Sequence, residues 1–444
     1  MVAIKPAPGH GPNYSVNSLS RNLTDCAKQR NGLYMKVLHT SDWHIGRALY
    51  GRKRYEEFGC FLDWLIGCIE SEGVEALLVA GDVFDNGTPS NRALELYYRF
   101  LCRCADAGCR HVVVTAGNHD SPSLLNAPRE VLRFLSVHVV GCMAEATEDE
   151  LVVLNDAEGK PELIVCAVPY LRDRDIRRAE AGESFEDKGR KLVEGIRNHY
   201  RQVGEAAVAK RLELGENLPI VAMGHLFTSG GQTVEGDGVR DLYVGTLGQV
   251  RADIFPDCFD YLALGHLHLA QRVSGSDLRR YSGAPIPMSF GEAGQRKVVV
   301  IVTVGTEGVT AQEILVPGFQ ALTTVRGDWK CITERIEELK KATSPVWLEV
   351  IYEGDEVIGD LQERLRELID GTALEILRAK NMRLVERTLS RMATEETLDD
   401  LTVDDVFARC LAAHEVPQEQ QAELVAAFRE TVAALHEEVS LGEP

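Results

Sequence analysis

The chain has 444 residues, 45% of them apolar and 26% charged, which is the balance of a globular protein and excludes a disordered or fibrous one. No apolar run reaches the roughly 18 residues of a membrane helix, and the N-terminus lacks the apolar stretch of a secretory signal. The net charge of −20 argues against a protein that binds nucleic acid through a basic face alone, although bound cations or a partner would change this balance.

The first 34 residues are rich in Gly, Pro, Asn and Ser, and we expect residues 1–34 to form a disordered tail. A strand pattern at residues 36–40 follows directly after Met35, so we expect either that Met35 is the functional start or that the tail is dispensable. The length of the chain predicts two or three domains beyond this tail.

Residues 35–318 alternate between short apolar runs and helical stretches, which predicts an α/β domain of layered sheets flanked by helices. Five runs rich in Val, Leu and Ile predict buried strands: residues 36–40, Ala76–Ala80, Val112–Ala116, Ile220–Met223 and Tyr261–Leu264. Helices are predicted between them, for example at 54–72 and 91–107, and a further strand is predicted at Lys297–Val304.

Two smaller segments complete the chain. Residues 319–385 predict a small α+β domain in β-α-β-α-β order, with elements at Ala321–Val325, Ile332–Ala342, Val346–Tyr352, Ile358–Leu368 and Leu374–Arg378. Residues 386–444 predict acidic, amphipathic helices, which either pack on their own domain or dock a partner protein. The eleven cysteines contain no CxxC pair, which favours free thiols in a reducing cytoplasm.

Each of the five strand-like runs is followed by side chains that can bind a metal. In chain order these are Asp42 and His44, then Asp82, Asn118 and His225, and finally His266 and His268. Ligands gather beyond the carboxyl ends of strands in open α/β sheets, so these side chains are expected to meet at one edge. Asp42, Asp82 and Asn118 could each be a turn or cap residue taken singly, but the combined pattern favours a site.

The types of ligand indicate the chemistry of this site. It contains no cysteine, and its carboxylates, amide and imidazoles fit manganese, iron or zinc in a hydrolytic centre. Seven ligands are too many for one ion but suit two, with Asp82 as the bridge. Two metals about 3.5–4 Å apart can stabilise both the attacking and the leaving oxygen of a phosphoryl displacement. His39, His111, Asp85 and Asp120 are expected to be structural or to orient their neighbours.

The motifs together resemble the calcineurin-like metallophosphoesterase superfamily. The resemblance is more specific to the bacterial SbcD exonuclease subunits. It rests on residues 38–46, 79–85, 263–268, 281–287 and 345–348, and it extends from about Met35 to the C-terminus.

This resemblance implies a role for each matching residue. Asp42, His44, Asp82 and His268 would hold one manganese ion, and Asp82, Asn118, His225 and His266 would hold the other. His119 would act as a catalytic residue that stabilises the phosphate or protonates the leaving oxygen. Archaeal and eukaryotic relatives carry a histidine at the position of Asp85, so the resemblance assigns no catalytic role to this aspartate.

The resemblance also implies a substrate and partners. It predicts a double-strand exonuclease and hairpin endonuclease that acts in DNA repair, recombination and replication. The chain would work as a homodimer within a heterotetramer with an SbcC-like coiled-coil ATPase. Residues 319–385 would then face DNA, and 386–444 would dock the ATPase. Arg47, Arg52, Lys53 and Arg54, with Arg172, Arg174, Arg177 and Arg178, are candidates for phosphate contacts or for solvated surface.

Two alternatives stay open from the sequence alone. A protein phosphatase or small phosphodiesterase could use the same metal core, because function depends on the surroundings of a site. A scaffold without turnover should lack some ligands, and all of them are present together with His119.

Overall fold

The computed structural model describes residues 33–177, 183–215, 218–228, 250–305, 308–341, 344–354, 356, 358 and 360–382, and a few single positions between 407 and 428. These residues divide into two compact units, with the boundary between Thr323 and Thr324. Much of the predicted tail and of the predicted C-terminal helices lies outside the described residues.

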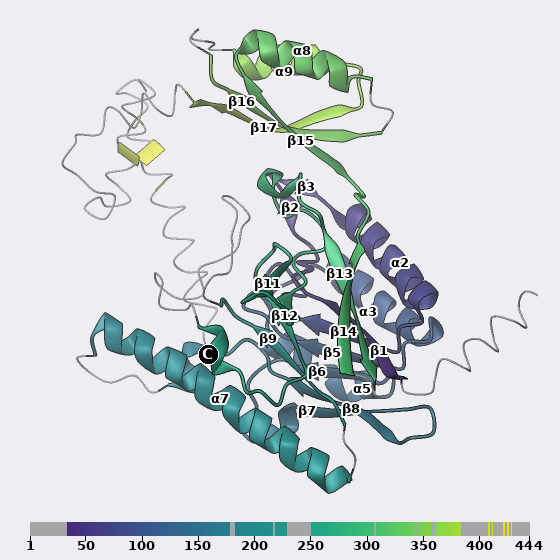
Figure 1. Ribbon diagram of the computed structural model, residues 1–444. Coiled ribbons are helices and arrows are strands. Elements are labelled where there is room, and N and C mark those ends of the chain that lie inside the picture. The colour runs from purple at the N-terminus through teal and green to yellow at the C-terminus, as the bar shows by residue number, and fades with distance from the viewer. Residues whose placement is uncertain are drawn as a thin grey trace, which may run out of the picture. The chain divides into compact units, whose positions relative to one another are not determined.

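The first unit contains two six-stranded sheets (Figure 1). The first has the order β14 (Gly308–Leu315), β13 (Val298–Gly305), β1 (Leu33–Thr40), β4 (Ala76–Ala80), β5 (His111–Thr115) and β6 (Val137–Val140). The second has the order β11 (Gln271–Val273), β12 (Ser276–Tyr281), β10 (Tyr261–Gly265), β9 (Ile220–His225), β8 (Pro161–Ala167) and β7 (Leu151–Asn155). β1 begins at Leu33, so residues 33 and 34 belong to this strand and not to the predicted tail.

A shared apolar core joins the two sheets. Val37 and Leu78 of the first sheet pack in one cluster with Val165 and Met223 of the second, and all four are fully buried. Strands with both faces covered read as continuous apolar runs, which explains why β4 and β9 could be recognised in the sequence. The sheets therefore form the layered α/β core that the sequence predicts.

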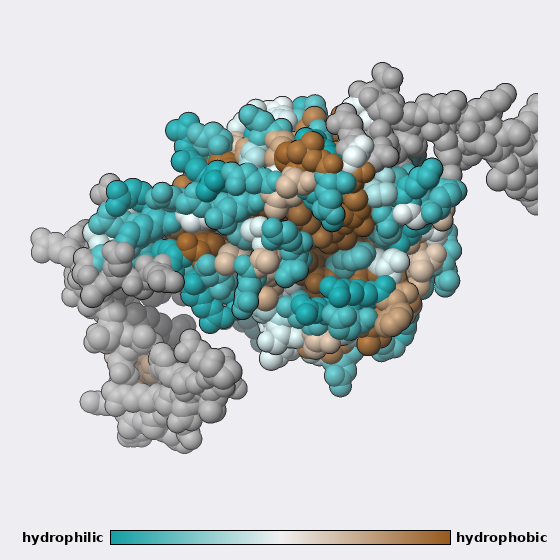
Figure 2. Space-filling view, turned by 90° about the horizontal axis from the view of Figure 1, so that it is seen from below, coloured by the Kyte–Doolittle hydropathy of each residue, from teal (hydrophilic) through white to brown (hydrophobic). Residues whose placement is uncertain are grey.

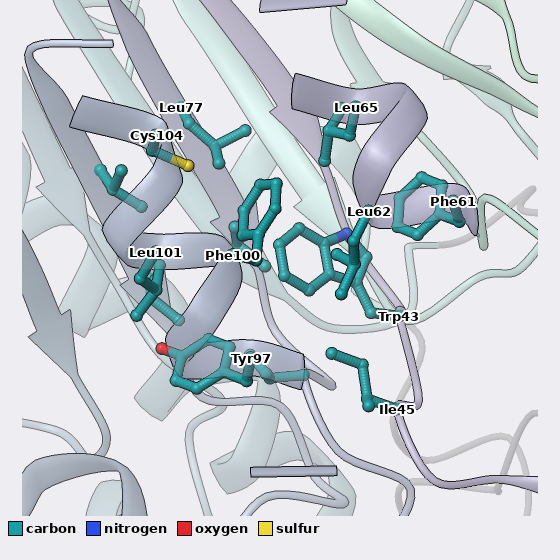
Figure 3. Packing of buried hydrophobic residues seen from close by; sticks show 14 of the residues in the cluster. Trp43, Ile45, Phe61, Leu62, Leu65, Leu77, Tyr97, Phe100, Leu101 and Cys104 are labelled. Atoms are coloured by element: carbon teal, nitrogen blue, oxygen red, sulfur yellow. The ribbon is translucent and has the colours of Figure 1, made fainter. Parts of the chain in front are cut away.

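Helices cover the outer faces of this sandwich. α2 (Tyr55–Glu72) and α3 (Asn91–Asp106) pack on the first sheet in one cluster, and α7 (Phe185–Leu214) packs on the second. Figure 3 shows Trp43 between these first two helices, where its ring meets Phe61 and Phe100 edge-on at 6.0 and 5.3 Å. Trp43 lies between two predicted ligands, so this packing anchors the loop that carries them.

Short helices and turns complete the first unit. α4 (Pro122–Asn126), α5 (Arg129–Arg133) and α6 (Asp173–Ile176) join the strands, together with the hairpin of β2 (Ala48–Leu49) and β3 (Arg52–Lys53). Short 3₁₀ helices among the described residues occur at Thr147–Glu150, Ala252–Ile254 and Phe290–Glu292. Figure 2 shows the protein from below the view of Figure 1. The surface of the described residues is mostly hydrophilic there, with apolar areas near the middle of the view.

The described residues between 321 and 382 form a three-stranded sheet with two helices. The strands have the order β15 (Ala321–Gly327), β16 (Val346–Tyr352) and β17 (Leu374–Asn381), and the helices are α8 (Trp329–Leu339) and α9 (Leu361–Ile369). The predicted β-α-β-α-β order of elements is confirmed. Asp328 caps α8 by accepting from the amide of Cys331, so this helix begins three residues before the predicted start.

The sequence reading missed several elements of the first unit. These are the edge strands β6, β7, β11 and β14, the inner strands β8 and β12, and the 30-residue helix α7. No helix among the described residues is long and apolar enough to cross a membrane. Nearly all of the helices predicted at Val403–His414 and Gln418–His436 lie outside the residues that the structure describes.

Candidate metal centre

The predicted ligands follow strands that run in the same direction. β1, β4 and β5 are parallel neighbours in the first sheet, and β9 and β10 are parallel neighbours in the second. The carboxyl ends of parallel neighbours lie at the same edge of a sheet, which is where Asp42, Asp82 and Asn118 follow the first three strands. The structure thus brings predicted ligands from both sheets to one place.

One group of ligand atoms is formed by Asp42, His44 and His268. These side chains offer atoms that all lie within 4.8 Å of one another, and all three residues are buried. Nε2 of His44 lies 3.2 Å from Nε2 of His268 and 3.6 Å from Oδ2 of Asp82. Two imidazole nitrogens that face each other at this distance are well placed to share a cation.

A second group of ligand atoms centres on His225. Asp42, Asp82 and His225 offer atoms within 4.8 Å of one another. Nε2 of His225 lies 3.3 Å from Oδ2 of Asp82 and 3.0 Å from Oδ1 of Asn118. The same carboxylate oxygen of Asp82 therefore lies near His44 and near His225, which is the position that a bridging ligand requires.

His266 completes the set of seven predicted ligands. Its ring centroid lies 5.4 Å from that of His225. Its Nε2 atom is buried and has no hydrogen-bond partner among the described residues. A buried polar atom without a partner costs free energy unless a ligand satisfies it, so this nitrogen fits a metal ligand. The donor set of the site accordingly fits two divalent metal ions.

Backbone strain is concentrated at these ligands. Asp42, His44, Asp82 and His266 have φ angles of 53°, 48°, 49° and 105°, and they are four of the seven described non-glycine residues with positive φ. Such conformations cost about 1–3 kcal/mol each and persist where the surrounding structure enforces them. The fold thus holds the ligand-bearing turns in geometries that the residues would not adopt alone.

Close backbone packing around Asp82 requires glycine at position 117. A Cβ atom on Gly117 would lie 2.1 Å from Oδ1 and 2.3 Å from the backbone N of Asp82. We expect Gly117→Ala to displace Asp82 and to weaken manganese binding by at least tenfold, as measured by titration calorimetry. Gly67→Ala is the matched control, because Gly67 lies in α2 with nothing within 4 Å of its Cβ position. Equal affinities of the two variants would contradict this expectation.

The protonation states are set by burial and by neighbouring charges. Burial holds the pKa of His44 and of His266 well below the usual range, so both rings are neutral near pH 7. Burial opposes the charged form of His225, but the neighbouring Asp82 carboxylate raises its pKa to about 9. Burial likewise opposes the Asp82 carboxylate, and His225 holds the pKa of Asp82 well below its usual value. The metal-free site therefore contains a buried ion pair.

This ion pair predicts that metal binding releases a proton. His225 must lose its Nε2 proton before this nitrogen can bind a cation, and its pKa of about 9 means that it carries this proton at pH 7. Manganese affinity should therefore rise with pH from 7 towards 9 and level off above. Calorimetry in buffers of different ionisation enthalpy measures the number of protons released. If the His225→Asn variant released the same number of protons as the wild type, the proton would not come from His225 and the prediction would be wrong.

Comparisons with known proteins place this site in a family. The calcineurin-like phosphoesterase family matches residues 35–270, and the family described as type 5 capsule protein repressor C-terminal domain matches residues 318–415. The SbcD subunit of nuclease SbcCD from Escherichia coli K12 is 38% identical over 404 residues, which cover 90% of this chain and 98% of that protein. The chain belongs to the SbcD family of calcineurin-like phosphoesterases.

Further relatives in the SbcD family carry the same name. The SbcD subunits of nuclease SbcCD from Rhodobacter capsulatus and Bacillus subtilis are 38% and 33% identical to this chain. The matches cover 59% and 63% of this chain, and 64% and 69% of those proteins. Membership of the SbcD family makes the chain a hydrolase of phosphodiester bonds.

His119 lies beside the ligands of this SbcD-family site. Its backbone N donates to Oδ1 of Asp82 at 2.8 Å, and its Nδ1 donates to the carbonyl oxygen of Asp85 at 2.7 Å. The His119 ring meets the His44 ring edge-on with centroids 4.7 Å apart. The carbonyl fixes the orientation of the imidazole and leaves Nε2 as the atom that can serve a substrate.

The residues that were predicted to be structural or to orient their neighbours contact other protein groups. Asp120 accepts from the backbone amides of Val83, Phe84 and Gly117 at 2.9 to 3.1 Å, which joins the β4 and β5 loops. His39 bonds Tyr261 and the carbonyl of Leu264, and burial lowers its pKa to about 3. His111 contacts the carbonyl of Asn155 at 2.8 Å. Asp85 has its Oδ1 atom 3.6 Å from Nδ1 of His44.

Sequence reasoning missed Glu292 and Lys297, which lie beside His268. Both residues are buried and the two side chains form an ion pair. Glu292 belongs to a short 3₁₀ helix and does not follow a strand, so it lies outside the pattern of polar residues after apolar runs. The signal available was the presence of a carboxylate and an ammonium group in the short stretch that leads into β13.

Proposed function

We propose that the chain is the metal-dependent nuclease component that cleaves DNA backbone phosphodiesters at ends and hairpins. The observation that carries this proposal is the buried cluster of carboxylates and imidazoles in which the Asp82 carboxylate lies between His44 and His225. Its relatives are named as the SbcD subunits of the nuclease SbcCD, which supports DNA as the substrate. Roles in DNA repair, recombination and replication belong to the same proposal.

Two metal positions are proposed from the geometry. Asp42, His44, Asp82 and His268 would hold one ion, and Asp82, Asn118, His225 and His266 would hold the other. The short distances within each group support this division. Manganese is our choice among the metals that this set of oxygen and imidazole ligands fits, because the resemblance to the SbcD subunits implies it.

The protein side chains would then divide the remaining work. When bound, the two ions supply electrostatic stabilisation of the charge on the phosphate oxygens. His119 would place its Nε2 atom against the phosphate and give a proton to the leaving 3′ oxygen. The Asp85 carbonyl oxygen holds the His119 ring at 2.7 Å and prevents it from turning away. Exclusion of water by the buried walls strengthens each of these interactions.

Contacts with the DNA backbone involve fewer basic residues than the sequence suggested. Arg54 is a correction, since its side chain is buried and bonds Glu57 at 2.7 Å. Arg177 is also engaged, because it pairs with Asp173 and Glu183. Arg52 and Lys53 are exposed on the β2–β3 hairpin and remain candidates for phosphate contacts. Arg178 lies outside the described residues.

The partners in this proposal are an SbcC-like coiled-coil ATPase and a second copy of the chain. Three apolar side chains in and after α5 are exposed to 69%, 91% and 38%: Val131, Phe134 and Leu135. Exposed apolar side chains that gather in this way often mark an interaction surface, which supports a homodimer within a heterotetramer. We assign residues 319–385 to the DNA-facing domain and 386–444 to ATPase docking. The nine described cysteines are free thiols, which supports a cytoplasmic protein.

Parallel assays with two substrates test the proposed function. The purified chain, with and without its ATPase, is incubated with manganese and either a labelled hairpin-ended duplex or a small nitrophenyl phosphodiester. We expect cleavage of the DNA, and its loss when a chelator removes the metal. Hydrolysis of the small ester without any action on DNA would instead establish a general phosphodiesterase. Loss of both activities in all conditions would favour a scaffold.

A further inference from the structure

A buried carboxylate lies behind one of the candidate metal ligands. Oε1 of Glu292 is 3.2 Å from Nδ1 of His268, on the side of the ring opposite to Nε2. The Glu292 side chain is fully buried and comes from the 3₁₀ helix at Phe290–Glu292. Nε2 of the same ring lies 3.2 Å from Nε2 of His44, inside the ligand cluster. The His268 ring is therefore held at one nitrogen and presented to the site at the other.

The carboxylate of Glu292 is itself fixed in place. Its Oε2 atom accepts from the ammonium group of Lys297 and from the backbone N of Met288, the latter at 3.2 Å. Lys297 also donates to the backbone oxygen of His268 at 3.2 Å and to Oε1 of Gln295 at 3.0 Å. Both charges are thus paired and hydrogen-bonded, which is the condition under which buried ions are tolerated.

This arrangement determines which nitrogen of His268 carries the proton. An ionised carboxylate can only accept hydrogen bonds, so Nδ1 of His268 must be the donor. The neutral ring then has its lone pair on Nε2, which is the form that binds a metal. Partners of this kind behind a metal-binding histidine typically contribute 10- to 100-fold to metal affinity.

We propose that Glu292, locked by Lys297, is a positioning residue that fixes the tautomer and orientation of His268 and thereby sets the affinity of one metal position. This inference rests on the proposed role of His268 as a metal ligand. Glu292 does not touch the substrate, and it acts through the ring that it holds. The 3₁₀ helix before β13 thus becomes part of the metal centre although it carries no ligand.

Two matched double variants separate the hydrogen bond from the buried charges. Glu292→Gln with Lys297→Met removes both charges and keeps an amide oxygen that can accept from Nδ1. Glu292→Leu with Lys297→Met removes the same charges and provides no acceptor. Both double variants lose the contacts of Lys297, so this loss does not contribute to the difference between their manganese affinities. We expect the leucine variant to bind manganese 10- to 100-fold more weakly at one of two positions, and the glutamine variant to stay within threefold of the wild type.

Calorimetric titration with manganese gives the affinity of each position without reference to cleavage. Glu150→Gln is the control for burial, because Glu150 is also a buried carboxylate that bonds a histidine, His199 at 2.8 Å, away from the ligands. This control should lose thermal stability and keep its manganese affinity. Equal affinities of the two double variants would overturn the proposal.

A further variant keeps the test decisive if the leucine protein does not fold. Glu292→Asp retains the negative charge for Lys297 but withdraws the carboxylate from Nδ1, and the same loss at one position is expected. Wild-type affinity in this variant would overturn the proposal. A failure of the proposed function can be told apart from a failure of this inference. In that case the wild-type protein would bind two manganese ions and leave DNA intact.

Discussion

Asp82→Asn is expected to abolish tight binding of both metal ions and to lower DNA cleavage by about 10³-fold or more. The carboxylate oxygen Oδ2 lies 3.6 Å from His44 and 3.3 Å from His225, so one side chain serves both groups of ligands. An amide is neutral and cannot bridge two cations as a carboxylate does. Several kcal/mol of charge stabilisation would be lost, and each 1.36 kcal/mol corresponds to tenfold in rate.

The Asp82→Asn variant should keep its fold, so a loss of metal binding can be attributed to the missing carboxylate and not to unfolding. The Oδ1 atom of the introduced asparagine can still accept a hydrogen bond from the backbone N of His119. This bond is one of those that join the loop after β4 to the loop after β5. Manganese titration and cleavage of a hairpin-ended duplex are measured together, with Asp63→Asn as control, because Asp63 is exposed and pairs only with Arg103 among the interactions described. Two ions bound with unchanged affinity would refute the role of Asp82 as the bridge.

His119→Gln is expected to reduce cleavage of DNA by about 10²- to 10⁴-fold while manganese affinity stays within threefold of the wild type. The ring of His119 is held by the Asp85 carbonyl and lies against His44, but the proposed metal positions do not include it. Glutamine retains a donor for that carbonyl and cannot transfer a proton. The substitution should therefore slow the chemical step of cleavage and leave metal binding unchanged.

The nature of the leaving group distinguishes the two roles proposed for His119. A nitrophenyl phosphodiester releases a phenolate that needs no proton, so it should be hydrolysed nearly as fast by the variant if His119 is a general acid. An equal loss with both substrates would show that His119 stabilises the phosphate instead. An equal loss accompanied by weaker manganese binding would place His119 among the metal ligands and overturn our assignment.

The strand-end ligands could be predicted because their signal is local. β4 and β9 are buried on both faces, so each reads as a short apolar run, and a polar group placed directly after such a run is conspicuous. The order of elements in the second unit was predicted for a similar reason. Its helices α8 and α9 have clear amphipathic periods, and the strand between them, β16, is a buried and mostly apolar run.

The missed features depend on contacts between distant parts of the chain. Glu292 lies 24 residues from His268, and nothing in the local pattern indicates that the two side chains meet. The edge strand β14 alternates exposed and partly buried residues, which gives a weaker pattern than a buried strand. Arg54 looked like a surface cation in a basic stretch, but its pairing with Glu57 takes it into the interior.

The origin of the ligands from two different sheets has a consequence for stability. Asp42 and Asp82 follow strands of the first sheet, whereas His225 ends β9 and His266 follows β10 in the second. Bound cations would cross-link the two sheets, since neither sheet alone can supply a complete set of donors. The metal-loaded protein should resist separation of its layers, and its melting temperature should climb with the logarithm of the free manganese concentration. Assembly of the sandwich and creation of the catalytic centre are then one event.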